Sequence, residues 1–405
     1  MRTSSVLAVM ASVVAVACGG SMDRAPKSAA APAAEPSGGA AYAPSESESA
    51  SYAQPGYPAA TPSPAAPPPA AGAPSPVVSA SSAKEEARAA DAPIAVSPRS
   101  EPRRLPQPGQ LTAGIWDDNR NYEFWKPYAL GFRRDNGGDF SMFTEQEMET
   151  ARDAANAAQS PRGELDVQLV LDTTGSMGDE LSYLQSEFDS IAARIKTRFP
   201  QMTPRWSLVL YRDKGDEYVT RQFDFTTDTN KFRADLRAQS ASGGGDTPEA
   251  VVQGLDAGAK MSWRAQQSNV AKVAFWVADA PAHPGEGKQL ASVVKNLKAK
   301  GVHVYPVASS DTDDAAEYQM RSAAQLTGGR YVFLTNDSGI GNAHAEPHIP
   351  CYAVTRLDSA ILRSIETEMT GRRVEPSNED VLRTVGKPDA QGKCKLSSGA
   401  LVASF

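Results

Sequence analysis

The sequence holds few of the residues on which many enzymes and membrane proteins depend. Its 405 residues include only three cysteines and four histidines. Beyond the extreme N-terminus no run of 18 or more apolar residues occurs, so we expect no transmembrane helix in the mature protein. Basic residues are not in excess, because the formal net charge is −7. A general nucleic-acid-binding protein needs a basic surface, so nucleic acid is not an expected partner.

A long N-terminal segment lacks the apolar residues from which a core is built. Residues 19–110 contain 18 of the 30 prolines, and about two-thirds of the segment is Ala, Pro, Ser or Gly. Such a segment cannot bury enough apolar surface to offset its ordering entropy, so we predict a disordered linker. Residues 1–110 carry eight basic and eight acidic side chains, so the whole net charge belongs to the part expected to fold, 111–405.

The first 18 residues predict export. The positive charge of Arg2 precedes a small apolar stretch, Val6–Ala17, as in a secretory signal. Cys18 follows directly, which resembles a bacterial lipobox, although Ala stands at the −3 position where Leu is commoner. The resemblance implies cleavage before Cys18 and acylation of its thiol. Because Gly19 stands where an inner-membrane retention signal would place Asp, it also implies anchoring in the outer membrane, on either face. An ordinary signal peptide with an incidental cysteine is the alternative.

The two remaining cysteines predict one disulfide. Cys351 and Cys394 form an even pair, which in an oxidising compartment favours a bridge. It would tie the C-terminal tail across a loop of about 43 residues, worth roughly 3–4 kcal/mol in the chain-entropy model. Two free thiols remain the alternative, because sequence alone does not fix the distance between their Cα atoms.

Apolar runs and helical spacing alternate through residues 161–340, the expected main domain. Strands are predicted at 165–171, 206–211, 218–225, 270–278, 302–308 and 330–334, the last of which is the last clear strand. Helices are predicted at 178–198, 229–239, 248–261, 287–300 and 313–327. This alternation predicts an α/β fold with a doubly wound, mostly parallel sheet and helices on both faces. Ligands of such sheets bind at the carboxyl ends of the strands.

The two flanks of this domain are less regular. Residues 111–160 are expected to form a small aromatic lead-in module followed by a polar helix at 143–158. The sequence leaves open whether this module is a separate domain. Residues 341–405 are expected to form one amphipathic helix, marked by Leu357, Ile361 and Met369, and the tail that the disulfide would tie.

Oxygen-bearing side chains follow three segments of the expected main domain. Asp172-Thr173-Thr174-Gly175-Ser176 comes directly after the first strand, and Gly243-Gly244-Gly245-Asp246-Thr247-Pro248 precedes an expected helix. Asp279 directly follows the strand predicted at 270–278. Carboxylates and hydroxyls without thiols suit a hard cation that keeps several waters, such as Mg²⁺.

The order and spacing of these motifs resemble the von Willebrand factor A domain, over about residues 163–340. That family has a metal-ion-dependent adhesion site with the motif D-x-[ST]-x-S, a Thr after a Gly-rich segment, and a later Asp. The resemblance implies a Rossmann-like fold and a bound Mg²⁺, or Mn²⁺ or Ca²⁺, with a partner's carboxylate completing its coordination. The implied metal ligands are Asp172, Thr174, Ser176, Thr247 and Asp279. Two features depart from the family: Thr174 replaces the commoner Ser, and Ala-Pro follows Asp279 where many members have Gly.

Competing motifs are incomplete. The D-T-T-G-S segment at 172–176 can be a simple Asx or Ser/Thr turn, and it resembles the D-T-G-S of aspartic proteases with an extra Thr and no second copy. Gly243–Gly245 lacks the G-K-[ST] of a P-loop. His344 and His348 have a zinc-like spacing, but Pro347 would break a helix that held both, so a surface loop is favoured. His283 can line the rim of the site, although a turn residue is the favoured interpretation.

We therefore expect a lipid-anchored binding or adhesion-type protein rather than an enzyme. Its metal site would capture an acidic or anionic group of a protein or other ligand in the cell envelope or outside. No activated nucleophile, His–carboxylate dyad or cofactor fingerprint is evident, so no catalytic residue is assigned. One alternative is a hydrolase in which a metal at Asp172 and Asp279 activates water and His283 transfers protons. Another is a structural envelope protein with a vestigial site.

Overall fold

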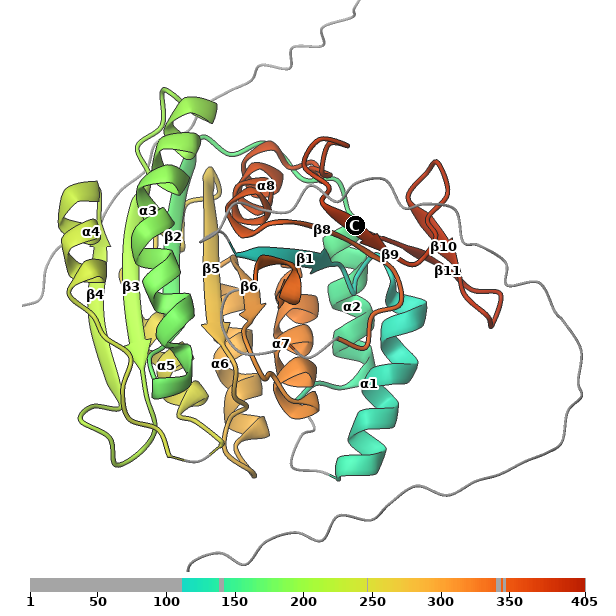
Figure 1. Ribbon diagram of the computed structural model, residues 1–405, viewed down its shortest axis with the longest axis horizontal. Coiled ribbons are helices and arrows are strands. Elements are labelled where there is room, and N and C mark those ends of the chain that lie inside the picture. Colours follow the sequence, from blue (N-terminus) through green and yellow to red (C-terminus); the bar gives the residue numbers. More distant parts are fainter. Residues whose placement is uncertain (1–110, 138–141, 246, 340–343, 345–346, 405) are drawn as a thin grey trace, which may run out of the picture. The chain divides into compact units, whose positions relative to one another are not determined.

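The computed structural model describes residues 111–137, 142–245, 247–339, 344 and 347–404 (Figure 1). The predicted export signal with Cys18 and the predicted linker at 19–110 lie outside these residues. The strands are β1 (Thr112–Trp116), β2 (Glu164–Asp172), β3 (Arg205–Tyr211), β4 (Thr220–Thr226), β5 (Val270–Ala278), β6 (Val302–Ala308), β7 (Tyr331–Thr335), β8 (Tyr352–Arg356), β9 (Arg383–Val385), β10 (Lys393–Lys395) and β11 (Leu401–Ala403). The α-helices are α1 (Tyr122–Asn136), α2 (Glu145–Asn156), α3 (Gly178–Arg198), α4 (Thr229–Arg237), α5 (Val251–Lys260), α6 (Gly287–Ala299), α7 (Asp314–Thr327) and α8 (Leu357–Thr370). None of these helices is long and apolar enough to cross a membrane.

One nine-stranded sheet organises the described residues, in the order β4-β3-β2-β5-β6-β7-β1-β8-β9. Its centre is parallel, because β3, β2, β5, β6 and β7 all run in one direction. Antiparallel strands flank this centre on both sides. The predicted α/β fold with a mostly parallel sheet and helices is confirmed. Strands β2 and β5 are buried almost throughout, as the central strands of a covered parallel sheet should be.

The sheet separates two hydrophobic cores. On one face Leu169 and Leu171 of β2 pack in the same core as Leu184 of α3, together with α4 and α8. On the other face Val170 of β2 shares a core with Leu255 of α5, together with α6 and α7 (Figure 1). Because successive side chains of a strand point to opposite faces, one unbroken apolar run supplies both cores.

The aromatic lead-in contributes a strand to this same sheet. β1 lies between β7 and β8, where Thr112 pairs with Thr335 on one side and with Arg356 on the other. Trp116 at the end of β1 and Trp125 in α1 are both fully buried in the core that also contains Leu255 of α5. The predicted helix at 143–158 is α2. The strand at 112–116 is not evident from the sequence, because Gly114 weakens its short pattern and its partners β7 and β8 are far away in the chain. The helix α1 is not evident because it contains Pro127 and Gly131.

Two predicted elements differ from the structure. Helix α5 begins at Val251 rather than at Pro248, because Glu249 is drawn into a β-bridge with Ala282 and donates its backbone N–H to the carbonyl of Pro281 (3.0 Å). Residues 330–334 are not the last strand. β8 and β9 also belong to the sheet, but β8 passes directly into α8 and β9 has only three residues, so neither forms an isolated apolar run. The amphipathic helix predicted after residue 341 is α8.

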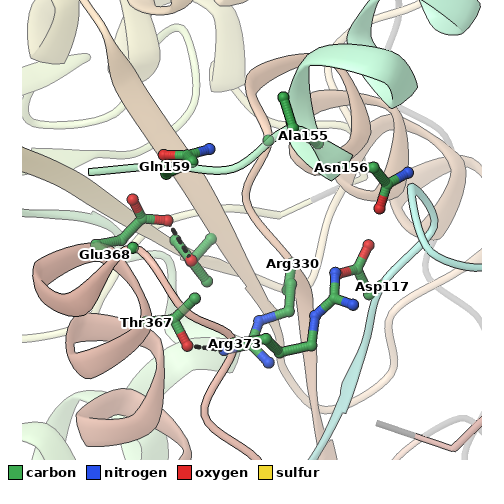
Figure 2. A pocket seen from close by; sticks show the side chains of 12 residues that line it. Asp117, Ala155, Asn156, Gln159, Arg330, Thr367, Glu368 and Arg373 are labelled. Atoms are coloured by element: carbon green, nitrogen blue, oxygen red, sulfur yellow. Dashed lines mark hydrogen bonds and ion pairs between the residues drawn. The ribbon is translucent and has the colours of Figure 1, made fainter. Parts of the chain in front are cut away.

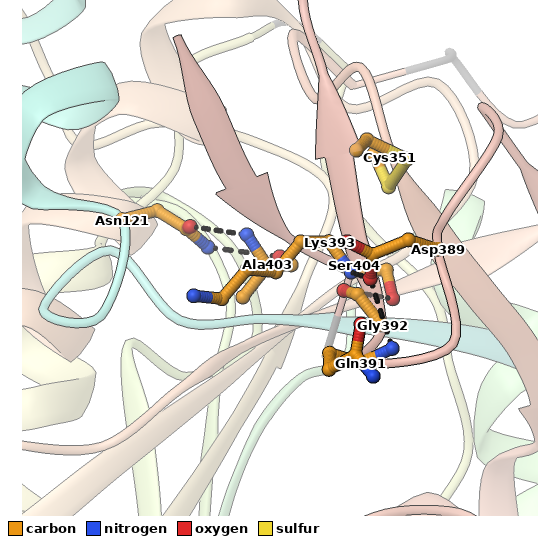
Figure 3. The surroundings of a disulfide bond; sticks show 9 residues. Asn121, Cys351, Asp389, Gln391, Gly392, Lys393, Ala403 and Ser404 are labelled. Carbon is orange, nitrogen blue, oxygen red and sulfur yellow. Dashed lines mark hydrogen bonds between the residues drawn. A yellow bond between two sulfur atoms is a disulfide. The ribbon is translucent and has the colours of Figure 1, made fainter.

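A disulfide ties the C-terminal tail to the domain, as predicted. Cys351, next to β8, is bonded to Cys394 in the β10–β11 hairpin, with Cα atoms 6.2 Å apart (Figure 3). The hairpin is also held at its far strand: the Asn121 amide donates to the carbonyl of Ala403 (3.0 Å) and accepts from its N–H (2.7 Å). The tail is therefore fastened both to β8 and to the residue that precedes α1.

Candidate functional site

The candidate site lies at the carboxyl edge of the parallel strands. β2 ends at Asp172 and β5 at Ala278, one residue before Asp279. The two strands are neighbours in register, with Leu171 opposite Val277. The first and third predicted motifs therefore meet at one edge of the sheet, as parallel pairing requires.

The loop after β2 curls so that alternate side chains converge. Asp172 is buried, and its Oδ1 accepts hydrogen bonds from the backbone N–H (2.9 Å) and the hydroxyl (2.7 Å) of Thr174. The Thr174 hydroxyl is 3.4 Å from that of Ser176. A short 3₁₀ turn over Gly175–Met177 produces this convergence and leads into α3. The side chains at 172, 174 and 176 therefore face one point, despite their strand-like spacing.

The Gly-rich loop closes over this turn. The N–H of Gly175 donates to the carbonyl of Gly243 (3.1 Å). Gly243 and Gly244 both have positive φ, a conformation that glycine adopts at little cost. A Cβ placed on Gly244 would lie 3.1 Å from the Thr174 Cβ, so the loop can approach this closely only without a side chain. The second motif thus packs directly on the first.

A pocket of about 460 Å³ opens where the three motifs meet. Its lining residues come from all three loops and from the loop after β6: Thr174, Gly175, Ser176, Gly243, Gly244, Gly245, Thr247, Glu249, Asp279, Ala280, Asp311 and Asp313. Four of the five predicted ligands therefore line one pocket. The fifth, Asp172, is bonded to the lining residue Thr174. The structure brings all five together, and their role as metal ligands remains a prediction.

Acidic groups at the site are held in a medium that disfavours their charge. Burial raises the pKa of Asp172 to about 7, and the charge of Asp279 adds to the rise. Burial also raises the pKa of Asp279, against the effect of the neighbouring Ser176 hydroxyl. Glu249 is buried as well, and burial followed by the charges of Asp172 and Asp213 raises its pKa to about 9. No lysine or arginine lies among the described residues that line the pocket, so no basic side chain of the lining offsets the charge of these carboxyl groups when they ionise.

Three oxygens of these carboxyl groups have no hydrogen-bond partner among the described residues. They are Oδ2 of Asp172, Oδ1 of Asp279 and Oε2 of Glu249, all removed from solvent. Buried polar atoms are normally paired, so unpaired oxygens around a pocket indicate room for a missing partner. A hard cation fits this set, because its preferred ligands are carboxylate and hydroxyl oxygens. Within the described ranges, no three His, Cys, Asp or Glu side chains form a metal-binding cluster by themselves, so hydroxyls would have to contribute.

Sequence reasoning missed three acidic residues of the pocket. Glu249 follows Thr247 by two positions, and its burial results from the bridge to Ala282. Asp311 and Asp313 come after β6, a further strand that ends at the same edge. The acidic run at 311–314, directly after a predicted strand, is the signal that could have indicated them.

The histidines lie outside the lining of this pocket. His283 contacts Asp213 through its Nε2 (2.6 Å from Oδ1). His344 is bonded to Asn336 (Nδ1 to Oδ1, 3.1 Å), whereas His348 is bonded to Glu317 (Nδ1 to Oε2, 3.1 Å). The zinc-like spacing therefore brings the two imidazoles to different partners.

Comparisons with known proteins identify the central part of the chain. The model of the von Willebrand factor A domain matches residues 166–343. A putative ariadne-like RING finger protein of Acanthamoeba polyphaga mimivirus is 25% identical over 188 residues, covering 42% of this chain and 18% of that protein. The alpha-protein kinase vwkA of Dictyostelium discoideum is 29% identical over 129 residues, covering 31% and 20%. The chain thus spans about a fifth of the length of these curated relatives.

The solved structures that match parts of the chain include two bacterial proteins. The conserved hypothetical protein BatB of Bacteroides thetaiotaomicron is 13% identical, with a TM-score of 0.35, and the match covers 51% of this chain and 98% of BatB. The pilus adhesin SpaC of Lactobacillus rhamnosus GG is 14% identical, with a TM-score of 0.31, covering 42% of this chain and 28% of the adhesin. The match to the family model shows that residues 166–343 of the chain are a von Willebrand factor A domain.

Proposed function

We propose that the pocket at the carboxyl edge binds a divalent cation, Mg²⁺ or Mn²⁺ or Ca²⁺, and through it captures an anionic group of a partner. The observation that carries the proposal is the pair of buried, unpartnered oxygens on Asp172 and Asp279, beside the hydroxyls of three further residues. The von Willebrand factor A match supports it, because domains of this family often bind a divalent metal and mediate protein–protein interactions.

The predicted metal ligands differ from one another in charge and in exposure to solvent. Thr174, Ser176 and Thr247 would offer neutral hydroxyls, and of these Ser176 and Thr247 are exposed at the mouth of the pocket. Asp172, which is buried next to the pocket, would supply negative charge, and its Oδ1 fixes the Thr174 hydroxyl by accepting a hydrogen bond from it. A bound cation would supply the positive charge that attracts an acidic group of a partner. Because two carboxylates are few for a divalent cation, binding by the protein alone should be weak.

We further propose that this domain acts outside the cytoplasm as a non-enzymatic binding module. The predicted signal and Cys18 support a lipid anchor in the outer membrane, and the Cys351–Cys394 disulfide is consistent with an oxidising compartment. The partner would then be a protein or other acidic ligand of the envelope or the exterior.

A metal-dependent hydrolase is the second candidate, and one contact favours it. His283 and Asp213 form a close pair, which is the arrangement of a general base with an orienting carboxylate. However, neither residue lines the pocket, so no proton path to the proposed metal is evident within the described residues. The binding function accounts for the pocket with fewer assumptions. A structural envelope protein with a vestigial site would bind no cation.

The test measures metal binding and partner capture in the same samples. Titration calorimetry with Mn²⁺ should show one weak site in the wild type and none in Asp172→Ala. Asp256→Ala is the matched control, because Asp256 is a half-exposed carboxylate on α5 that pairs with Lys260 and lies outside the lining of the pocket. Envelope extract passed over the immobilised protein in Mg²⁺ should release a defined partner on addition of EDTA. Equal Mn²⁺ binding by wild type and Asp172→Ala would refute the site. Turnover of ester or phosphoester substrates that is lost in His283→Ala would favour the hydrolase.

A further inference from the structure

A second pocket lies at the opposite edge of the sheet and is not used by the proposed function. Its volume is about 210 Å³. The lining comes from the ends of β1, α2 and α8 and the residues just after them, from β6, and from the turn before β7: Asp117, Ala155, Asn156, Ala157, Gln159, Tyr305, Gly328, Arg330, Thr367, Glu368, Gly371 and Arg373. Arg330 directly precedes β7, so this is the amino edge of the parallel strands, whereas the candidate metal site is at their carboxyl edge.

Arg330 is the unusual member of this lining. It is only 4% exposed, yet its single hydrogen bond to the described residues is from Nη2 to the hydroxyl of Thr367 (2.9 Å). Its Nε has no partner among those residues, and none of their carboxylates forms an ion pair with it. Arginine is almost never buried without a counter-charge, because removing an ion from water is costly. Among the described residues, the buried Arg330 guanidinium therefore has no counter-charge.

A second buried arginine adds to this excess of positive charge. Arg363 of α8 is 7% exposed, and its Nη2 donates to the hydroxyl of Thr355 (3.0 Å), while Nη1 has no partner among the described residues. Burial, and then the nearby charge of Arg330, lower the pKa of Arg363 to about 10. The charges of Asp380 and Glu375 oppose this lowering, but neither acid forms an ion pair with Arg363 in the described part of the chain.

The acidic groups of the pocket are already engaged. Asp117 forms an ion pair with Arg373 and also accepts the backbone N–H of Arg120 (2.9 Å). Glu368 accepts from His303 (2.8 Å) and Tyr305 (2.6 Å). Burial opposes its ionisation, but these contacts hold the pKa of Glu368 below its usual value. These acids therefore do not neutralise Arg330.

We infer that this amino-edge pocket binds a small oxyanion, a phosphate or a carboxylate group, between Arg330 and Arg373. Figure 2 shows Arg330, Arg373 and Asp117 gathered on one side of the pocket, with Gln159 and Glu368 on the other. The planar fork of a guanidinium matches both oxyanions, and two such groups on one pocket are a common means of recognising them. A volume of 210 Å³ suits such a group or a small molecule that carries it.

The test is calorimetric titration of the purified full chain with inorganic phosphate and, separately, with acetate, at constant ionic strength set by NaCl. Saturable binding of one of the two anions is expected, and the anion that binds identifies the chemistry. Arg330→Gln should weaken that binding by at least about tenfold, since it removes a charge-assisted pair. The exposed Arg134→Gln, whose guanidinium pairs with Asp135, is the matched control and should bind as the wild type does.

Asp117→Asn separates binding from a purely structural role. The amide keeps an acceptor for Arg120 but releases Arg373 and removes a negative charge, so affinity should rise by roughly tenfold. A structural role for the arginines would give no such rise. If Arg330→Gln fails to fold, Arg373→Gln on the half-exposed wall should show the loss instead. Absence of saturable binding of both anions, or equal affinity in wild type, Arg373→Gln and Asp117→Asn, would overturn the inference. Asp172→Ala should retain the binding, which makes this test independent of the metal site.

Discussion

The two carboxylate oxygens of Asp172 have different surroundings. Oδ1 accepts two hydrogen bonds from Thr174, and Oδ2 is buried without a hydrogen-bond partner among the described residues. The hydrogen bonds to Oδ1 fix the side chain, whereas no group among the described residues compensates the charge at Oδ2. Burial raises its pKa from 3.8 to about 7, so in the absence of a cation the folded state holds a proton that the unfolded chain has released.

This shift makes a prediction about pH in the absence of metal. Between about pH 4 and 7 the folded state binds more protons at Asp172 than the unfolded state, so the free energy of unfolding should fall as pH rises. Asp172→Asn keeps Oδ1 as an acceptor and removes the penalty. In EDTA at pH 8 this variant should unfold at a higher temperature than the wild type, and its free energy of unfolding should be larger by up to about 4 kcal/mol. Both differences should shrink toward pH 4. Melting curves of both proteins across this range test it, with Asp256→Asn as the surface control. Parallel curves for wild type and Asp172→Asn would contradict the prediction.

The loops that follow strands decide whether the site forms. Gly244 has a φ of +67°, and an added Cβ would approach both Thr174 and Glu249. Gly244→Ala should therefore cost roughly 1 kcal/mol through its backbone and in addition displace the Thr174 loop, weakening Mn²⁺ binding. Gly399→Ala is the matched control, because Gly399 has a similar φ of +85° but open space around it. Both variants should lose stability, and only Gly244→Ala should lose metal affinity. Equal Mn²⁺ affinities in the two variants would show that the close approach is unimportant.

The C-terminal hairpin is the element that most depends on covalent support. In the described part of the chain, β10 and β11 form a two-stranded sheet of their own. The disulfide, the hydrogen bonds of Asn121 and the buried side chain of Val402 hold this hairpin to the domain. Cys394→Ser should lower the free energy of unfolding by about 2–4 kcal/mol, because it restores the entropy of a 43-residue loop to the unfolded chain. Urea unfolding with and without reductant measures this loss, and the reduced wild type should match the variant. Recovery of both cysteines as alkylated free thiols from exported protein would disprove the bridge in the cell.

Elements with an unbroken local pattern could be predicted, and those fixed by distant partners could not. The run at 165–171 and the helical spacing at 178–198 correspond to β2 and α3 almost to the residue. β1 was missed because its character depends on β7 and β8, which are more than 200 residues away in the chain. At the site, the resemblance to the von Willebrand factor A domain implied all five candidate ligands. Glu249 was missed because only a bridge to another loop buries it.

At the scale of the whole molecule, the sheet separates two edges with different chemistry. Among the described residues, the carboxyl edge gathers acidic oxygens without hydrogen-bond partners, and the amino edge holds Arg330 without a counter-charge. The amino edge is built partly by segments outside 166–343, because α8 and the chain around Asp117 and Arg373 complete its pocket. The flanking segments therefore add a surface that the matched domain does not have by itself.

The last prediction concerns how this molecule is held in place. Cys18 is the residue that the lipobox resemblance assigns to acylation. Because acyl chains would supply the membrane affinity, about 0.8 kcal/mol per CH₂, Cys18→Ser should move the protein from the membrane to the soluble fraction and abolish palmitate labelling. Mn²⁺ affinity should stay unchanged, since the folded domain begins far along the chain from Cys18. Fractionation, labelling and calorimetry on the two proteins test this together. Continued incorporation of palmitate into Cys18→Ser would show that the anchor lies elsewhere, and a loss of Mn²⁺ binding would show that anchoring and the site are coupled.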